Sequence, residues 1–212
     1  MIVSRLRRAE QVARNRELVL AAARRVFLAR GYAGASLEAI ADDAGFSSGV
    51  VYSQFGSKAD MFFALLERRI EDRAAQNKRI AVEFAGADGV RELIRVAQHD
   101  AAAEPGWPYL LAEFRALAMR DADLNRRYAA AHARTVDGIA SVLEALYKPT
   151  DLEPPVSVRS IAEYYQAGAV GVALERAANP DALPDNDFER LLLRALGLMD
   201  TALSPAARGR RR

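Results

Sequence analysis

The stretch GFSSGVVYSQF, residues 45–55, places three serines, a tyrosine and a glutamine within eleven positions, together with two glycines. Hydroxyl and amide groups donate hydrogen bonds to phosphate oxygens and to base edges, and glycine lets another backbone come close. Phe46, Val51 and Phe55 are large apolar members that can pack inward. The serines, Tyr52 and Gln54 would form a polar face that suits a protein core poorly, so we interpret this face as a surface for binding nucleic acid.

Groups suited to catalysis or metal binding are scarce by comparison. The chain has no cysteine, and its only histidines are His99 and His132. Neither lies in an HExxH motif, and neither has a glutamate three residues earlier, because Val96 and Ala129 stand there. We therefore expect no enzyme activity, no metal and no cofactor. A helical enzyme, or an adaptor that does not bind DNA, remains the alternative class.

Composition and charge set broader limits. With 212 residues, of which 51% are hydrophobic and 27% charged, the chain resembles an ordinary globular protein. No apolar run is long enough for a membrane span, and charge precedes any apolar run at the N-terminus, so we expect a cytoplasmic protein. The net charge is only +2, yet residues 1–30 hold eight arginines against two glutamates. That local excess indicates an anionic partner or a solvated helix face.

Apolar residues recur with helical periodicity and strand patterns are almost absent, which predicts an all-α fold. Gly31 and Gly45 stand where the first two helices should end. Ser36 and Ser57 can each cap a helix start, and Ser57 has capping-box spacing to Asp60. Proline- and aspartate-rich loops are expected at 105–108, 148–155 and 179–187. We expect helices at 10–30, 36–44, 48–53, from 58 onward, 87–103, 109–119, 121–147, 157–178 and 186–203.

Two short helices joined by a glycine turn, 36–44 and 48–53, have the proportions of a helix-turn-helix. The run G-Y-x-x-x-S-L-x-x-I-A-x-x-A-G-F-S-x-G-x-V-Y-x-x-F-x-S-K, residues 31–58, resembles the DNA-binding domain of the tetracycline-repressor (TetR) family of bacterial regulators. The resemblance covers about residues 10–62. Where the family usually has threonine, valine, leucine and histidine, this chain has Ser36, Phe46, Val51 and Gln54.

The resemblance implies that helix 48–53 lies in the major groove of double-stranded operator DNA. The residues nearest the base edges would be Ser48, Gly49, Val50 and Ser53, with Ser47 at the helix start. The residues that hold the DNA backbone would be Ser36, Tyr52, Gln54 and Lys58. No arginine, asparagine or glutamine stands at a base-edge position, so bidentate base reading would be sparse and no operator sequence is predicted.

In the rest of the chain the resemblance implies architecture only, namely a larger helical domain that dimerises and binds a small-molecule effector. We divide the chain into a flexible basic arm (1–9), a three-helix helix-turn-helix domain (10–56), the effector-binding and dimerisation domain (57–204) and a basic tail (205–212). His132 and Thr135 interrupt an apolar stripe, as the polar groups of a pocket for a bulky apolar effector would. The expected effector-binding residues are Trp107, Tyr109, Phe114, Tyr128, His132 and Thr135. Ordinary core packing is the alternative.

The last two helices fit a homodimer interface, because helix 186–203 is apolar on most of its circumference. The predicted interface residues are Tyr165, Gly168, Val172, Phe188, Leu192, Leu196 and Met199. Burial within one subunit is again the alternative. Together these expectations describe a ligand-responsive transcriptional regulator, in the first instance a repressor released from a palindromic operator by its effector, and otherwise an activator of the same fold.

Overall fold

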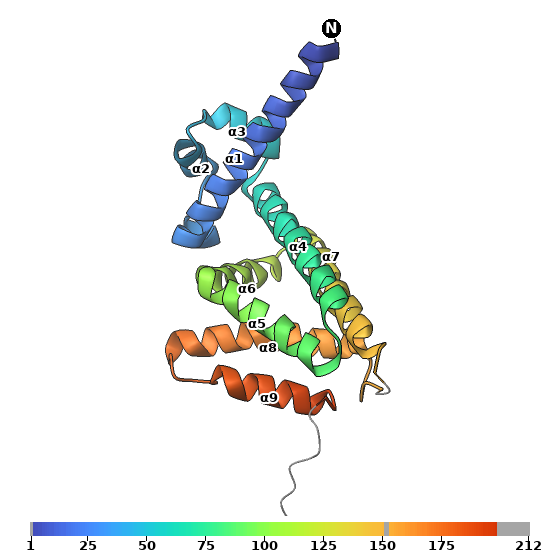
Figure 1. Ribbon diagram of the computed structural model, residues 1–212. Helices are drawn as coiled ribbons and strands as arrows, with labels where there is room; N and C mark the ends of the chain where they lie inside the picture. The colour runs from blue at the N-terminus through green and yellow to red at the C-terminus, as the bar shows by residue number, and fades with distance from the viewer. Residues whose placement is uncertain (1, 151–152, 199–212) are drawn as a thin grey trace, which may run out of the picture. The chain divides into compact units, whose positions relative to one another are not determined.

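The computed structural model describes residues 2–150 and 153–198, and every regular element in that part of the chain is an α-helix (Figure 1). The prediction of an all-α fold is confirmed. Within the described ranges, no helix is long and apolar enough to cross a membrane. The helices are α1 (Ile2–Gly34), α2 (Leu37–Ala44), α3 (Ser48–Phe55), α4 (Lys58–Glu83), α5 (Gly86–Ala103), α6 (Gly106–Ala118), α7 (Ala122–Tyr147), α8 (Val158–Ala178) and α9 (Asp185–Ala195).

The chain packs into two compact units. Unit 1 contains Met1–Ala75 and Asp100–Thr135, and unit 2 contains Gln76–His99 and the chain from Val136. Helices α4 and α7 each begin in unit 1 and end in unit 2. The domain boundary predicted after residue 56 falls inside unit 1, because the first turn of α4 supplies Met61 and Phe62 to the core that α1 to α3 also share.

An aromatic cluster lies at the centre of unit 1. Phe27, Tyr32, Phe62 and Phe114 are all at most 6% exposed. The rings of Phe62 and Phe114 stack with their centroids 4.0 Å apart, and Tyr32 meets Phe114 edge-on at 4.8 Å. Such ring pairs stabilise a core beyond the area they bury. Because the rings come from α1, α4 and α6, the cluster joins α6 to the N-terminal helices.

Helix α1 departs from helical geometry at Gly31, where φ is 68° and ψ is 177°. The break frees the N–H groups of Tyr32 and Ala33, and each donates to one carboxylate oxygen of Glu113 on α6 at 2.8 Å. A methyl group at Gly31 would lie 2.6 Å from that carboxylate. Glycine is therefore required here both by the positive φ and by the close approach of α6.

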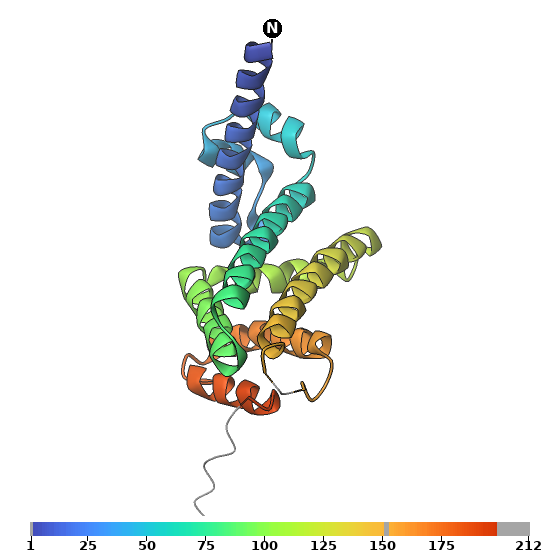
Figure 2. The same ribbon diagram turned by 45° about the vertical axis from the view of Figure 1, so that its right-hand side comes forward.

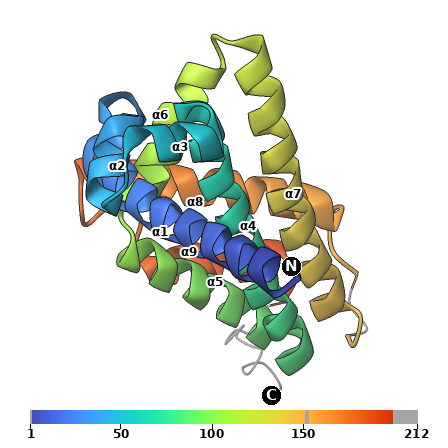
Figure 3. The same cartoon turned by 90° about the horizontal axis from the view of Figure 1, so that it is seen from above.

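Helix α1 reaches back to Ile2 and is drawn as one long ribbon (Figure 3). Residues 2–9, predicted to form a flexible arm, are thus helical. The reason is local: Leu6, Arg7, Arg8 and Ala9 are strong helix formers, and residues 2–9 contain neither proline nor glycine.

Two other predicted boundaries are wrong. Helix α6 begins at Gly106 instead of 109, since Pro108 falls in its first turn, where a missing N–H costs nothing. Helix α9 ends at Ala195, because Gly197 has a φ of 68° and the N–H of Leu198 returns to the carbonyl of Leu193 at 2.9 Å. This is the glycine-based closure of a helix end. The rest of the predicted helix, from residue 199, lies outside the described residues.

The core of unit 2 is mainly aliphatic. Val90, Ile94 and Leu146 are at most 1% exposed and come from α5 and α7. The phenol of Tyr147, at the end of α7, donates to the carbonyl of Leu196 at 2.5 Å. Helices α8 and α9 run side by side in this unit (Figures 1 and 2). The C-terminal segment is thus tied to α7 by a buried hydrogen bond as well as by apolar packing.

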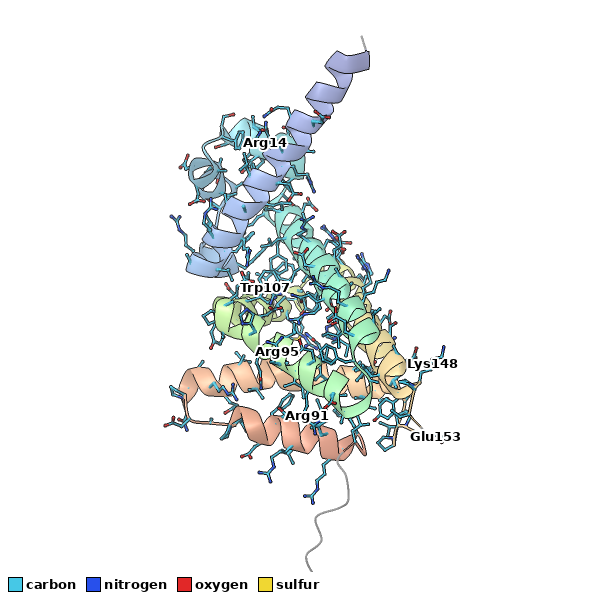
Figure 4. The ribbon with its side chains drawn as sticks, viewed as in Figure 1. Arg14, Arg91, Arg95, Trp107, Lys148 and Glu153 are labelled. Carbon is cyan, nitrogen blue, oxygen red and sulfur yellow. The ribbon has the colours of Figure 1, made fainter. Side chains whose placement is uncertain are left out.

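A largely buried carboxylate links three segments of unit 1. The Glu104 side chain is 11% exposed, and it accepts hydrogen bonds from Arg24 on α1 and, at 2.7 Å, from Arg69 on α4. The Arg69 guanidinium also lies 4.5 Å from the ring centroid of Trp107, at the start of α6 (Figure 4). Burial alone would raise the pKa of Glu104, but the Arg24 hydrogen bond and the charges of Arg69 and Arg24 outweigh it and lower that pKa below the ordinary 4.5.

We predict that Glu104→Gln lowers the free energy of unfolding by about 1–3 kcal/mol at neutral pH. Because the folded-state pKa is depressed, the ionised carboxylate stabilises the fold above its ordinary value of 4.5, and this contribution is lost as the pH falls through the lower folded value. Urea unfolding across this acid range measures the effect, with the exposed Glu71→Gln as control. A difference in the free energy of unfolding between wild type and variant that stays constant as the pH falls would contradict the prediction.

Candidate nucleic-acid interface

Helices α2 and α3 form a helix-turn-helix, and they lie beside α1 (Figure 3). Ser36 caps α2 as predicted, because its hydroxyl accepts from the N–H of Ala39 at 3.1 Å. Gly45 follows with a φ of 73°, and the N–H of Phe46 returns to the carbonyl of Ala41 at 2.9 Å. The turn needs a positive φ, which glycine adopts without strain. The angle between the two helices is thus set by local hydrogen bonds.

Helix α3 has two chemically different faces. Val51 is fully buried and Phe55 is 6% exposed, so the predicted inward face is confirmed for both. The other face is made of small residues and one phenol. Gly49 has no neighbouring atom within 4 Å of the place where a Cβ would lie. The exposed positions are Ser47, Gly49, Tyr52 and Ser53, and the predicted contact residues Ser48, Val50 and Gln54 are half-buried.

Arg16 on α1 fastens the C-terminal end of α3, a role that the sequence did not suggest. Its guanidinium donates to the backbone carbonyl of Gln54 at 3.4 Å and lies 4.3 Å from the ring centroid of Phe55. A positive charge near the last carbonyls of a helix is favourable. The side-chain oxygen of Gln54 is buried and has no hydrogen-bond partner among the described groups. That oxygen is therefore turned away from the surface on which DNA would lie.

The phenol of Tyr52 is held by an acidic residue, Glu38 in the first turn of α2. The Tyr52 hydroxyl donates to the Glu38 carboxylate at 2.8 Å, and 46% of Tyr52 remains exposed. This hydrogen bond raises the pKa of Tyr52. The pKa of Glu38 is lowered by its own backbone N–H, by Tyr52 and by Ser36. An ionised carboxylate thus lies beside the hydroxyl that was predicted to meet a phosphate.

Lys58, also predicted to hold phosphate, is engaged with the protein. Its amino group donates to the carbonyls of Tyr32 at 2.8 Å, Ala35 at 3.0 Å and Ala33 at 3.4 Å. It also lies 4.6 Å from the ring centroid of Tyr32. An ammonium group has three donors, so these carbonyls occupy all of them. Lys58 therefore holds the segment between α1 and α2, and direct contact with phosphate would require it to leave these carbonyls.

Two family models match the chain, one in its N-terminal part and one in its C-terminal part. Residues 19–65 match the model described as bacterial regulatory proteins, tetR family. Residues 86–200, more than half of the chain, match the model described as BetI-type transcriptional repressor, C-terminal. The chain belongs to the TetR family of transcriptional regulators. The helix-turn-helix formed by α2 and α3 is accordingly the DNA-binding part of a TetR-family regulator.

The chain is also similar to one curated transcriptional activator over a short segment and, in fold, to solved structures. The HTH-type transcriptional activator FasR of Mycolicibacterium smegmatis is 41% identical over 58 residues, which are 27% of this chain and 26% of FasR. The alignment thus spans about a quarter of that relative. The structure of the fatty acid degradation regulator FadR from Bacillus halodurans superposes with a TM-score of 0.70 at 15% identity, covering 85% of this chain and 96% of FadR. The structure of Salmonella enterica GusR superposes with a TM-score of 0.69 at 20% identity, covering 86% of this chain and 95% of GusR.

The predicted effector residues of this TetR-family chain all lie in unit 1. Trp107 is 4% exposed and Phe114 is fully buried, so both belong to the core. Tyr128 lies between Phe114 and His132, with ring centroids 6.0 Å and 6.2 Å away. Burial raises the pKa of the Tyr128 phenol, which keeps it neutral. The structure thus brings three of the predicted residues together in one row of rings.

Of two other predicted effector residues, one is exposed and the other has a hydrogen-bond partner in its own helix. Tyr109 is 39% exposed. The hydroxyl of Thr135 donates to the carbonyl of Ala131 in its own helix at 3.3 Å. Such a bond back to the preceding turn satisfies the hydroxyl without any ligand. The polar pair expected from His132 and Thr135 is thus not a pair of free hydrogen-bonding groups.

The predicted dimer interface needs a correction, because several of its residues pack inside their own chain. Tyr165 is 8% exposed and Leu196 is 1% exposed. Phe188 and Leu192 are partly buried against the same core of unit 2, and a Cβ at Gly168 would lie 3.4 Å from the Phe188 ring. Val172 is half-buried, and Met199 lies outside the described residues. The apolar stripe chosen from the sequence is the stripe that faces the core.

Other apolar residues of the same two helices face outward. Tyr164 on α8 is 80% exposed, Leu174 on α8 is 43% exposed and Leu191 on α9 is 69% exposed. Ala167 is exposed between the first two. Residues 164, 167, 171 and 174 follow the three-to-four spacing of one helix face. We call Tyr164, Ala167, Leu174 and Leu191 the outer α8–α9 residues.

We predict that Glu38→Gln tightens DNA binding about three- to tenfold. Glutamine keeps an acceptor for the Tyr52 phenol and removes a negative charge that repels phosphate. Fluorescence anisotropy with a labelled DNA duplex at fixed salt measures the change, and the exposed Glu83→Gln on α4 controls for the equal change in net charge. If both variants bind alike, Glu38 has no special place on the DNA-facing surface.

Proposed function

We propose that the chain is a ligand-responsive repressor that binds a palindromic double-stranded DNA operator as a homodimer and is released by a small apolar effector. It would act through binding, without catalysis. Helix α3 would enter the major groove. Residues near base edges would be Ser48, Gly49, Val50 and Ser53, while Ser36, Ser47, Tyr52 and Gln54 would hold the DNA backbone. Lys58 would support this surface from behind through its three carbonyl contacts.

The observation that carries the DNA-binding part is the exposed face of α3. A helix that served only packing would have no use for an open glycine beside three hydroxyl groups. The empty space around Gly49 allows a DNA backbone or base edge to approach the helix closely. Because the proposed base-edge residues lack long bidentate donors, sequence preference would depend in part on the shape of the DNA.

The outer α8–α9 residues support a homodimer. Large exposed apolar side chains on neighbouring helices lose their contact with water when a second copy covers them. The twofold symmetry of a dimer matches a palindromic operator, whose half-sites lie about 34 Å apart along the duplex. The subunit contact proposed here uses Tyr164, Leu174 and Leu191, and Tyr165 and Leu196 remain in the core of each subunit.

We predict that Leu191→Glu converts the dimer to a monomer and lowers operator affinity at least tenfold, since each subunit would then bind one half-site alone. Sedimentation velocity gives the oligomeric state. Val82→Glu is the matched control, because Val82 is also an exposed apolar residue, at 78%, but lies on α4. A Leu191→Glu protein that remains dimeric would place the interface elsewhere.

Repression is favoured over activation by the match of residues 86–200 to the BetI-type repressor model. Activation remains the alternative, because the FasR relative, matched over 58 residues, is described as a transcriptional activator. Repression and activation predict opposite results in one measurement. Deleting the gene should raise expression of the neighbouring genes for a repressor and lower it for an activator.

An apolar effector is supported by the aromatic and aliphatic character of both cores. The row formed by Phe114, Tyr128 and His132 offers ring faces and an uncharged phenol. Such a lining suits a bulky, mostly apolar molecule with few polar groups. A native mass spectrum of the purified protein would show whether such a molecule is carried through purification.

We predict that the protein prefers DNA from beside its own gene over a scrambled duplex by about a thousandfold at physiological salt. Anisotropy titrations across a salt series measure both affinities. Tyr52→Phe should weaken binding to both duplexes by a similar factor, since a phosphate contact carries no sequence information. Tyr109→Phe, which removes an exposed phenol on α6, outside both the α3 surface and the outer α8–α9 residues, is the control. Equal affinity for the two duplexes at every salt concentration would refute the regulator proposal.

A further inference from the structure

Asn77, on the part of α4 that belongs to unit 2, is more deeply buried than any other amide or charged side chain whose burial is described. It is 4% exposed. Its neighbours one turn later, Ile80 and Ala81, belong to the aliphatic core of that unit. The side chain is therefore held in surroundings that offer few hydrogen-bonding groups.

The protein satisfies very little of the Asn77 amide. The nitrogen Nδ2 donates to the backbone carbonyl of Gly138 on α7 at 3.4 Å, which is long for such a bond. The oxygen Oδ1 has no hydrogen-bond partner among the described groups. An asparagine side chain has two donor hydrogens and an oxygen that can accept twice. One long bond thus leaves most of this capacity unused in an apolar interior.

The orientation of the amide follows from its neighbour. Exchanging Oδ1 and Nδ2 would place an acceptor against the acceptor oxygen of Gly138 and lose the only hydrogen bond. The unsatisfied atom is therefore the oxygen, and the missing partner is a hydrogen-bond donor. Gly138 leaves space beside the amide, because a Cβ there would still be 4.0 Å from Nδ2.

We propose that Asn77 is the polar contact for the effector, and that the effector places a neutral hydrogen-bond donor, a hydroxyl or an amide N–H, on Asn77 Oδ1. This rests on the proposed ligand response of the regulator and names the chemistry of its ligand. The apolar remainder of the molecule would lie against aliphatic side chains of the same core, such as Ile80, so we place the effector in the core of unit 2 and not at the row of rings in unit 1.

The donor must be neutral because the described core has nothing to balance a charge. Among the side chains whose burial is described, no Asp, Glu, Lys or Arg is buried as deeply as Asn77, and the largely buried carboxylate of Glu104 lies in unit 1, paired with Arg24 and Arg69. Moving an unpaired ammonium or carboxylate from water into such surroundings costs far more than one hydrogen bond to an amide returns. A hydroxyl or amide loses less on leaving water, and Asn77 recovers most of that loss.

The test compares two isomeric probes, 1-decanol, which has a hydroxyl donor, and 1-methoxynonane, which has only an ether acceptor, by isothermal titration calorimetry with the full chain and no DNA. Wild type should bind the alcohol about tenfold more tightly, the factor that one hydrogen bond of ordinary strength supplies. Asn77→Leu, close in size and apolar, should bind the two probes within about twofold of each other. Asn125→Leu, at an exposed position on α7, should behave as wild type.

Three results would overturn the proposal: no preference in wild type, a preference that survives in Asn77→Leu, or no binding of either probe to wild type. If Asn77→Leu does not fold by circular dichroism, Asn77→Ala replaces it, since it adds no bulk. If Oδ1 instead holds a buried water, the preference for the alcohol would be the same in wild type and in Asn77→Leu. Because no DNA is present, loss of operator preference and loss of alcohol selectivity are separate failures.

Discussion

Two carboxylates, one on α6 and one just before it, hold the N-terminal helices of unit 1. Glu113 uses both oxygens on the N–H groups of Tyr32 and Ala33, and Glu104 joins Arg24 to Arg69. Hydrogen bonds to a charged group are short and strong, and they weaken steeply when stretched. The end of α1, and with it the start of α2, therefore cannot move independently of α6. The surface of α3 depends on this attachment, because Phe55 and Val51 pack into the same core.

The parts of this fold that sequence reasoning could predict are those whose partners are close along the chain. Ser36 and Ala39, Phe46 and Ala41 in the bond that closes the Gly45 turn, and Ser57 and Asp60 all lie within five residues of each other. Lys58 bonds to carbonyls more than twenty residues away, and Glu113 meets Tyr32 across eighty-one residues. Nothing local marks such a partner. The sequence identified α8 and α9 but did not show which of their apolar residues pack inside the subunit, since periodicity locates an apolar stripe without showing what covers it.

Glu38 shows why affinity and selectivity need separate arguments at the DNA-facing surface. A surface made only of hydroxyls and cations would attract every duplex through its phosphates. Here a carboxylate accepts a hydrogen bond from the Tyr52 phenol, and in the proposed complex its negative charge would oppose nonspecific attraction. To bind DNA, the phenol would have to exchange the Glu38 carboxylate for a phosphate as its hydrogen-bond acceptor. The gain in binding free energy would then be small unless the other contacts also fit. The acidic residue costs total affinity and favours the fully matched site.

Asn77 could not have been singled out from the sequence, because nothing about an asparagine at this position suggested either burial or function. Leucine would fill a similar volume in the aliphatic core and leave no acceptor without a partner. A buried unsatisfied polar group costs about 1–3 kcal/mol, so folding alone is better served by leucine at this position. The single long bond to Gly138 does not offset that cost. Asparagine, unlike leucine, provides an acceptor for a hydrogen-bond donor on a bound ligand. The proposed ligand contact therefore explains why a destabilising residue stands at this position.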